Sequence, residues 1–142
     1  MYESGALNPN DSKNIAIAEK MYEQIRKRRT DILNVARNSG FSIEQCTIIK
    51  DYIFSNMHEL SNGYKRFVPD IAIAQSWFRL SQKKCKTIYR HDSIMLLHEL
   101  TEITYLMTNT RATHDEAHRY AERKYNYSLA CREYYSKLGI KL

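Results

Sequence analysis

Apolar residues recur in alternating steps of three and four through much of this chain, and this spacing constrains the fold more than any other feature. Such steps place side chains on one face of an α-helix, whereas a half-buried strand needs strict alternation. The stripes comprise Ile15, Ala18, Tyr22, Ile25, Ile32 and Ala36, then Cys46, Ile49, Ile53, Met57 and Leu60, then Ile73, Ala74, Trp77 and Leu80, and finally Leu96, Leu100, Ile103 and Met107. Only four glycines and two prolines interrupt 142 residues. We therefore predict an all-α protein.

Start and stop signals divide the chain into five or six helices. Residues 1–9 are expected to form a loose lead-in, and residues 10–142 a single compact helical domain. The first helix is expected over 10–38 with Gly40 ending it, and the second is expected to continue to a break at 61–63. Each later helix is expected to begin at a capping residue, namely Ser42, Asp70, Asp92, Thr113 and Ser128.

Cysteine usage and hydropathy favour a protein of a reducing cytoplasm. The cysteines at 46, 85 and 131 are too far apart for a zinc knuckle or a redox motif, and Cys46 falls on an apolar stripe as a small buried hydrophobe. The chain shows no secretory signal and no apolar segment of the roughly 20 residues that cross a bilayer. We therefore expect no membrane association.

The charge balance favours polyanionic partners. Twenty-two lysines and arginines against sixteen acidic residues give a formal net charge of +6. An excess of this kind raises the local concentration of nucleic acids and nucleotides near a protein surface. Nucleic acid or a nucleotide is therefore the expected substrate class.

Ionisable side chains gather in the run from 92 to 127. His98 and Glu102 are four residues apart and Glu99 precedes Glu102 by three, so these side chains are neighbours on one expected helix. Glu99 lies at the edge of an apolar stripe, where a carboxylate is costly to bury without a partner. A connection of about five residues predicts that the next helix runs antiparallel, with His118 facing Glu99 or Glu102.

His98, Glu99, Glu102 and His118 are the predicted catalytic residues, and two chemistries are open to them. In one, His98, Glu102 and His118 bind a divalent metal that activates water. In the other no metal is needed, and His98 and Glu99 act as an acid/base pair on a phosphodiester. HELTE differs from the zinc motif HExxH because glutamate stands at 102. The structural alternative is a buried polar network that fixes helix register.

Basic and aromatic side chains near this run are the predicted substrate contacts. A basic loop directly precedes the helix that carries His98, and arginines on either side of it are suited to phosphate oxygens. The predicted substrate-binding residues are Arg66, Arg79, Lys83, Lys84, Arg90 and Tyr125.

A family resemblance adds a biological context. The chain contains, in order, ALNPN, TDILNVA, KRFVPDIAIAQSWFRL, HDSIMLLHELTE and EAHRYAERKYNY. This order resembles a small helical domain of bacterial polymorphic toxins and of the C-terminal regions of phage minor head proteins. Its most specific parts are Asp70 with Trp77 and Arg79, the HE-x-x-E at 98–102, and Ala117–His118 before Tyr125-Asn126-Tyr127. The resemblance implies a phage- or prophage-encoded effector in the cytoplasm of a bacterial cell, with a cognate immunity or host protein as partner.

Two functions of different classes follow. The leading hypothesis is a toxin-like or effector-like hydrolase that cleaves a phosphodiester or nucleotide bond at the His/Glu site, with a divalent metal as its cofactor in one version. The alternative is a non-enzymatic, phage-encoded inhibitor or regulator that binds nucleic acid or an acidic protein. The hydrolase predicts a pocket opening onto Glu99 and His118, whereas the regulator predicts that these groups are sealed and mutually paired.

Overall fold

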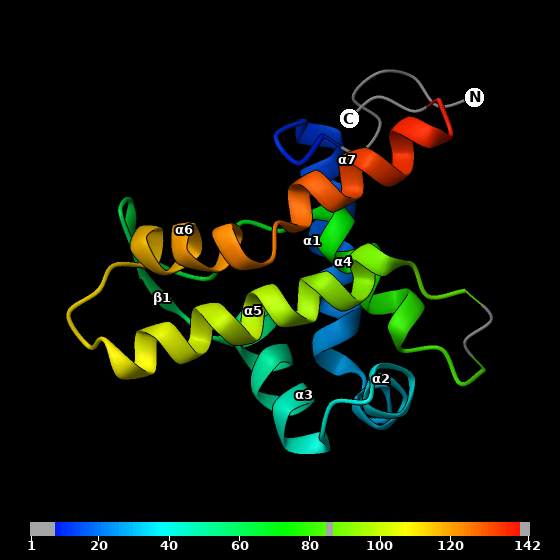
Figure 1. Ribbon diagram of the computed structural model, residues 1–142, viewed down its shortest axis with the longest axis horizontal. Coiled ribbons are helices and arrows are strands. Elements are labelled where there is room, and N and C mark those ends of the chain that lie inside the picture. Colours follow the sequence, from blue (N-terminus) through cyan, green and yellow to red (C-terminus); the bar gives the residue numbers. More distant parts are fainter. Residues whose placement is uncertain (1–7, 85–86, 140–142) are drawn as a thin grey trace.

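Helices account for most of the architecture in the computed structural model, which describes residues 8–84 and 87–139 (Figure 1). Residues 1–7 of the predicted lead-in and Cys85 lie outside these ranges. The described elements are α1 (Ser12–Lys27), α2 (Asp31–Ser39), α3 (Ile43–Lys50), the π-helical turn η1 (Asp51–Ser55), β1 (His58–Leu60), β2 (Gly63–Lys65), α4 (Ile71–Leu80), α5 (Arg90–Thr108), α6 (His114–Lys124) and α7 (Tyr127–Lys137). The predicted all-α class is confirmed.

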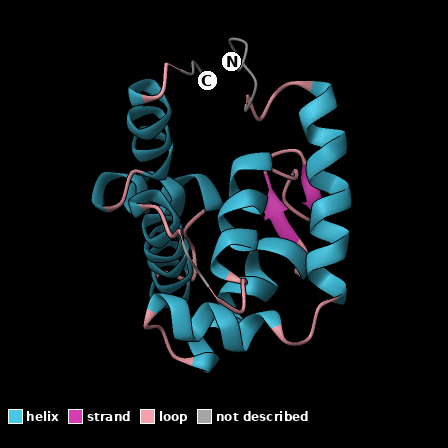
Figure 2. Cartoon of the chain, turned by 90° about the vertical axis from the view of Figure 1, so that its right-hand side faces the viewer, coloured by secondary structure: helices cyan, strands magenta, loops and turns pink. Residues whose placement is uncertain are grey.

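A short antiparallel hairpin is the one departure from helix among these elements (Figure 2). β1 and β2 pair with Leu60 opposite Gly63, and Gly63 has a φ of 128°. A side chain is strained at that φ, so glycine suits the turn. The second predicted helix was expected to continue to a break at 61–63, and this is wrong. α3 ends at Lys50, and η1 and the hairpin follow it.

The single helix predicted over 10–38 is also wrong, because the chain breaks between α1 and α2. Arg28 has an extended backbone, and its carbonyl accepts a 2.7 Å hydrogen bond from the Nζ of Lys50. The same ammonium group binds the carboxylate of Asp31 at 2.9 Å. A buried ion pair with a residue far along the chain therefore bends the path at a place where the sequence has no glycine or proline.

Three of the five predicted helix starts are confirmed. Ser42 accepts from the backbone N–H of Gln45 and forms a complete capping box, and Asp70 and Thr113 cap α4 and α6. The prediction for Asp92 is wrong, because α5 begins at Arg90 and Asp92 instead accepts from the N–H of Tyr89. Asn126 rather than Ser128 caps the last helix, because α7 begins two residues earlier than expected.

The core fixes the position of α5, which packs against α3, α4, α6 and α7. The largest fully buried side chains of the core include Trp77, Phe54, Ile25, Ile49, Leu80 and Leu96. Cys46 and Cys131 are buried free thiols, as the stripe position of Cys46 predicted. None of the described helices combines the length and the apolar character that crossing a membrane would require.

Candidate metal centre

The seam between α5 and α6 brings together the polar side chains that the sequence singled out. The two helices run antiparallel, as the short connection predicted (Figure 1). Ala117 and Ala121 of α6 are fully buried, and side chains this small allow two helices to approach closely. His98 and Glu102 from α5 and His118 from α6 meet beside this contact.

Three side-chain atoms form a nearly equilateral triangle at this seam. The Nε2 of His98 lies 3.3 Å from the Oε2 of Glu102 and 3.3 Å from the Nδ1 of His118. The Nδ1 of His118 lies 3.4 Å from the same Oε2. These groups could hold a metal ion, since each offers one ligand atom toward the others. The His98, Glu102 and His118 triad is called the triangle below.

The protons of His98 explain why the triangle suits a cation. Its Nδ1 lies 2.9 Å from the carbonyl oxygen of Tyr125, and a carbonyl only accepts, so Nδ1 must carry a hydrogen. In a neutral imidazole Nε2 is then a lone pair. That lone pair faces an oxygen of Glu102, which also has only lone pairs to offer. A proton or a metal ion between them relieves the repulsion.

The size of the triangle agrees with tetrahedral coordination. Zinc–nitrogen and zinc–oxygen bonds of about 2.0–2.1 Å at tetrahedral angles separate neighbouring ligand atoms by about 3.3–3.4 Å. One face of an octahedral site with bonds of the same length has edges of about 3.0 Å. The observed edges of 3.3, 3.3 and 3.4 Å match the first value. The donor set, two imidazoles and one carboxylate, is also one that zinc takes in catalytic sites.

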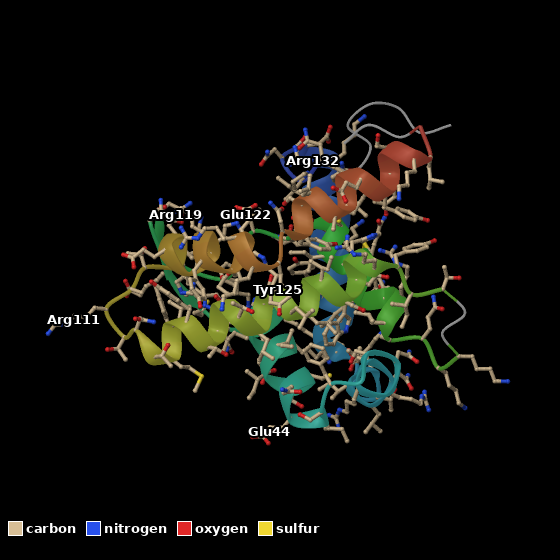
Figure 3. All side chains as sticks on the ribbon, viewed as in Figure 1. Glu44, Arg111, Arg119, Glu122, Tyr125 and Arg132 are labelled. Carbon is tan, nitrogen blue, oxygen red and sulfur yellow. The ribbon has the colours of Figure 1, made fainter. Side chains whose placement is uncertain are left out.

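Each member of the triangle has an outer partner. The backbone carbonyl of Tyr125 holds the ring of His98, and the phenol of Tyr52 donates to the Oε1 of Glu102 at 2.5 Å. The carboxylate of Glu122 lies 3.8 Å from the Nε2 of His118. Figure 3 labels Glu122 on α6 and Tyr125 just beyond its end. Metal-binding histidines and carboxylates are usually oriented by such partners.

Hydrogen bonds keep the carboxylate of Glu102 ionised. Burial alone would raise its pKa, but the hydrogen bonds from His118 and Tyr52, together with the neighbouring imidazole of His98, outweigh burial and lower the pKa to about 2. The hydrogen bond to Glu102 in turn raises the pKa of His118 above its ordinary value. Glu102 therefore carries a negative charge at neutral pH, which is the form that binds cations.

Glu99 lies apart from the triangle. Its side chain is buried, with 8% of the residue exposed, and in the described part of the chain it makes no hydrogen bond or ion pair. The predicted acid/base pair of His98 and Glu99 is therefore not in contact. Burial raises the pKa of Glu99 well above its ordinary value, and the negative charges of Glu102 and Asp70 raise it further. Burial therefore favours the protonated, neutral form of Glu99.

Replacing Glu99 by glutamine is expected to stabilise the metal-free protein at pH 7. A carboxyl whose pKa rises on folding keeps a proton that the unfolded chain releases, so stability falls as pH rises above the unfolded pKa of about 4.3. Glutamine has no such loss. Urea unfolding in EDTA should show the variant more stable at pH 7, with the difference vanishing near pH 4.

The matched control is Glu44→Gln, an exposed position on α3 where stability should not change. Two outcomes would contradict a protonated, buried Glu99. One is a Glu99→Gln protein less stable than wild type at pH 7, and the other is a stability difference from wild type that is the same at pH 7 and pH 4.

The predicted substrate-binding residues are dispersed over the surface. Arg79 makes a two-point ion pair with Asp92, at 2.8 and 2.7 Å, and the Nε of Arg66 donates to the carbonyl of Ser55. Lys83 and Lys84 are exposed in the described part of the loop after α4.

Arg90 and Tyr125 are the two predicted substrate contacts that share a surface hollow. Both line a hollow of about 440 Å³ between α5 and α7. This hollow and three others lined by described residues have neither Glu99 nor a member of the triangle in their lining. The pocket that the hydrolase hypothesis predicted at Glu99 and His118 is not among them.

Two residues near the triangle went unassigned in the sequence. Tyr52 comes from η1, and the Nδ1 of His114 lies 3.2 Å from its hydroxyl. His114 is four residues from His118 and shares its helix face, which is a usable signal. The sequence gives no comparable signal for Tyr52. Its side chain reaches Glu102 because of the π-helical turn η1, and no residue spacing predicts such a turn.

The chain was compared with protein-family models, with curated proteins and with solved structures, and no match was found in any of the three. Support for a function therefore comes from the triangle itself: two imidazoles and an ionised carboxylate on neighbouring helices, each with an outer partner. This arrangement defines a candidate centre for one divalent ion.

Proposed function

We propose that this protein is a single-metal hydrolase that cleaves a phosphodiester or nucleotide bond. His98, Glu102 and His118 would hold a zinc-class divalent ion. The observation that carries the proposal is the triangle, in which the Nε2 of His98 and the Oε2 of Glu102 present lone pairs to each other at 3.3 Å. A divalent ion bound by all three ligand atoms relieves this repulsion, as a proton shared between the same groups also would.

Access to solvent favours a catalytic rather than a structural ion. The side chain of His118 is 54% exposed, whereas those of His98 and Glu102 are each 6% exposed. Structural zinc sites use four protein ligands, and catalytic sites use three and keep one position open. An ion held this way would act as a Lewis acid and lower the pKa of bound water toward neutrality. His98, Glu102 and His118 would fix its place, and the buried side chains of His98 and Glu102 would exclude competing ligands on that side.

The substrate class is proposed from charge and from the toxin-like resemblance. The net charge of +6 favours a polyanion. Arg119 is exposed on α6, on the side facing away from α5 (Figure 3), and contributes to the basic charge of this surface. The guanidinium of Arg79, predicted to bind phosphate, is held by Asp92. A toxin or effector role in a bacterial cytoplasm remains part of the proposal.

The test is hydrolysis by zinc-loaded protein. Wild type, Glu102→Gln and the control Glu44→Gln are stripped with EDTA, reloaded with zinc and assayed on bis(p-nitrophenyl) phosphate and on RNA and DNA. Glu44 projects from α3 on the side of the view opposite to α6 (Figure 3). Zinc should restore activity to wild type and Glu44→Gln, and Glu102→Gln should lose at least about 100-fold, since even outer partners of a metal are worth 10–100-fold.

Wild-type protein that is no faster with zinc than with EDTA would overturn the proposal, and so would a Glu102→Gln protein with the wild-type rate. Expression in bacteria adds a second readout. Wild type should arrest growth with degraded nucleic acid, and Glu102→Gln should not.

A non-enzymatic regulator is the second candidate, favoured by the mutual pairing within the triangle and by the position of the four hollows elsewhere. In this case the polar groups would fix helix register, and the basic surface would bind nucleic acid or an acidic protein. Salt-sensitive binding of nucleic acid without turnover, unaffected by Glu102→Gln, would support it.

A further inference from the structure

The π-helical turn η1 places Tyr52 beside Glu102. In this turn the N–H of Asn56 bonds to the carbonyl of Asp51, five residues back, at 2.8 Å. One such turn adds a residue to a helix and re-aims the side chains that follow, and it occurs often at functional sites. Here Lys50 points to Asp31 on one side of α3, and Tyr52 points to Glu102 on α5. The widened turn thus aims the phenol at a metal-ligand candidate.

The hydrogen bonds of Tyr52 run in one direction. Its hydroxyl has a single proton, and the ionised carboxylate of Glu102 can only accept, so the phenol donates to Oε1 at 2.5 Å. The oxygen of the phenol is then an acceptor, and the Nδ1 of His114 at 3.2 Å is its donor. The chain from His114 through Tyr52 to Glu102 begins at a half-buried imidazole and ends at the triangle.

Aromatic packing holds this chain in place. The Nε2 of His58 donates to the backbone carbonyl of Tyr52 at 2.8 Å, which ties the hairpin to the π turn. The ring of His58 stacks on Phe67 with centroids 3.9 Å apart, and Phe67 meets the edge of Tyr52 at 5.3 Å. His114 packs edge-on to His58 at 4.9 Å. The three rings of His58, Phe67 and His114 therefore hold the ring of Tyr52, and with it the hydroxyl, in place.

We propose that Tyr52 is a positioning residue of the metal centre, which occupies the Oε1 of Glu102 so that Oε2 alone is presented to the ion, and that His114 holds Tyr52 in this role. The inference rests on the proposed function, because it requires a metal at the triangle. A carboxylate that is free at both oxygens can bind in a bidentate manner and fill the position that water or substrate needs. One occupied oxygen keeps the ion four-coordinate with that position open.

Cobalt(II) tests this inference, because its visible absorption is strong in tetrahedral sites and weak at higher coordination numbers. Wild type, Tyr52→Phe and the control Tyr64→Phe, an exposed tyrosine of the hairpin, are titrated with cobalt and with zinc against a chelating dye. Tyr52→Phe should bind zinc about 10–100-fold more weakly. Its cobalt spectrum should lose intensity as Glu102 becomes bidentate. Tyr64→Phe should match wild type.

The outcomes separate the two proposals. Wild type that binds neither metal refutes the metal centre and with it the proposed function. Wild type that binds, with Tyr52→Phe equal to it in affinity and spectrum, refutes only the role of Tyr52. His114→Gln guards against a folding defect in Tyr52→Phe, and it should weaken zinc binding by a smaller factor. Unchanged zinc binding in His114→Gln would remove His114 from the chain.

Discussion

Replacing Asp31 by alanine is expected to destabilise the protein by about 3–5 kcal/mol, because it leaves a buried charge without its partner. Asp31 is 2% exposed, and both of its carboxylate oxygens are in use. Oδ1 binds the Nζ of Lys50 at 2.9 Å, and Oδ2 accepts from the Nε1 of Trp77 at 3.0 Å. Without the carboxylate, the ammonium group of the buried Lys50 is left with the carbonyl of Arg28, at 2.7 Å, as its hydrogen-bond partner. Urea unfolding at pH 7 measures the change.

Two variants make this result specific. Glu23→Ala removes an exposed carboxylate paired with Lys27, and stability should hardly change because solvent screens such pairs. The double variant Asp31→Leu with Lys50→Met should recover most of the loss, since an apolar pair of similar volume often replaces a buried ion pair without penalty. A loss below about 1 kcal/mol for Asp31→Ala would contradict the role given to this ion pair.

The same ion pair shows why the sequence predicted the helices better than their ends. Apolar spacing records which face of a helix is buried, and that information is local. The break between α1 and α2 depends on Lys50, nineteen positions after Asp31, which reaches back to two groups at the bend. No glycine or proline marks the position. A helix of 10–38 was therefore the reasonable prediction from local pattern, and tertiary contacts overruled it.

The candidate site shows the same difference between features set by local spacing, which the sequence predicted, and features set by tertiary contacts, which it did not. His98 and Glu102 are neighbours because they are four apart on one helix, and the short connection brought His118 opposite them, so the triangle was predictable. Glu99 was given a partner that it lacks, since one residue along a helix turns a side chain by about 100° away from its neighbour. Arg79 was assigned to phosphate, but Asp92, thirteen positions later, holds it through two hydrogen bonds.

Zinc is expected to raise the melting temperature of the metal-free protein, and replacing His98 by alanine should abolish that shift. A ligand at 100 times its dissociation constant stabilises the folded state by about 2.7 kcal/mol. For a chain of this size the gain corresponds to about 5–15 °C. His98 supplies one of the three ligand atoms from a ring already fixed by Tyr125, so its loss opens the triangle on its buried side. Thermal unfolding followed by circular dichroism, with zinc and with EDTA, measures both effects.

Magnesium provides the matched control for metal identity. It prefers oxygen ligands in octahedral geometry, so a site of two imidazoles and one carboxylate should leave the melting temperature unchanged with magnesium. Glu44→Gln should show the full zinc shift, because its exposed side chain lies on α3. Equal shifts with zinc and magnesium would point to nonspecific binding at surface carboxylates. A zinc shift that survives in both His98→Ala and His118→Ala would place the ion elsewhere, and the lone pairs at the α5–α6 seam would then need a proton, not a metal, between them.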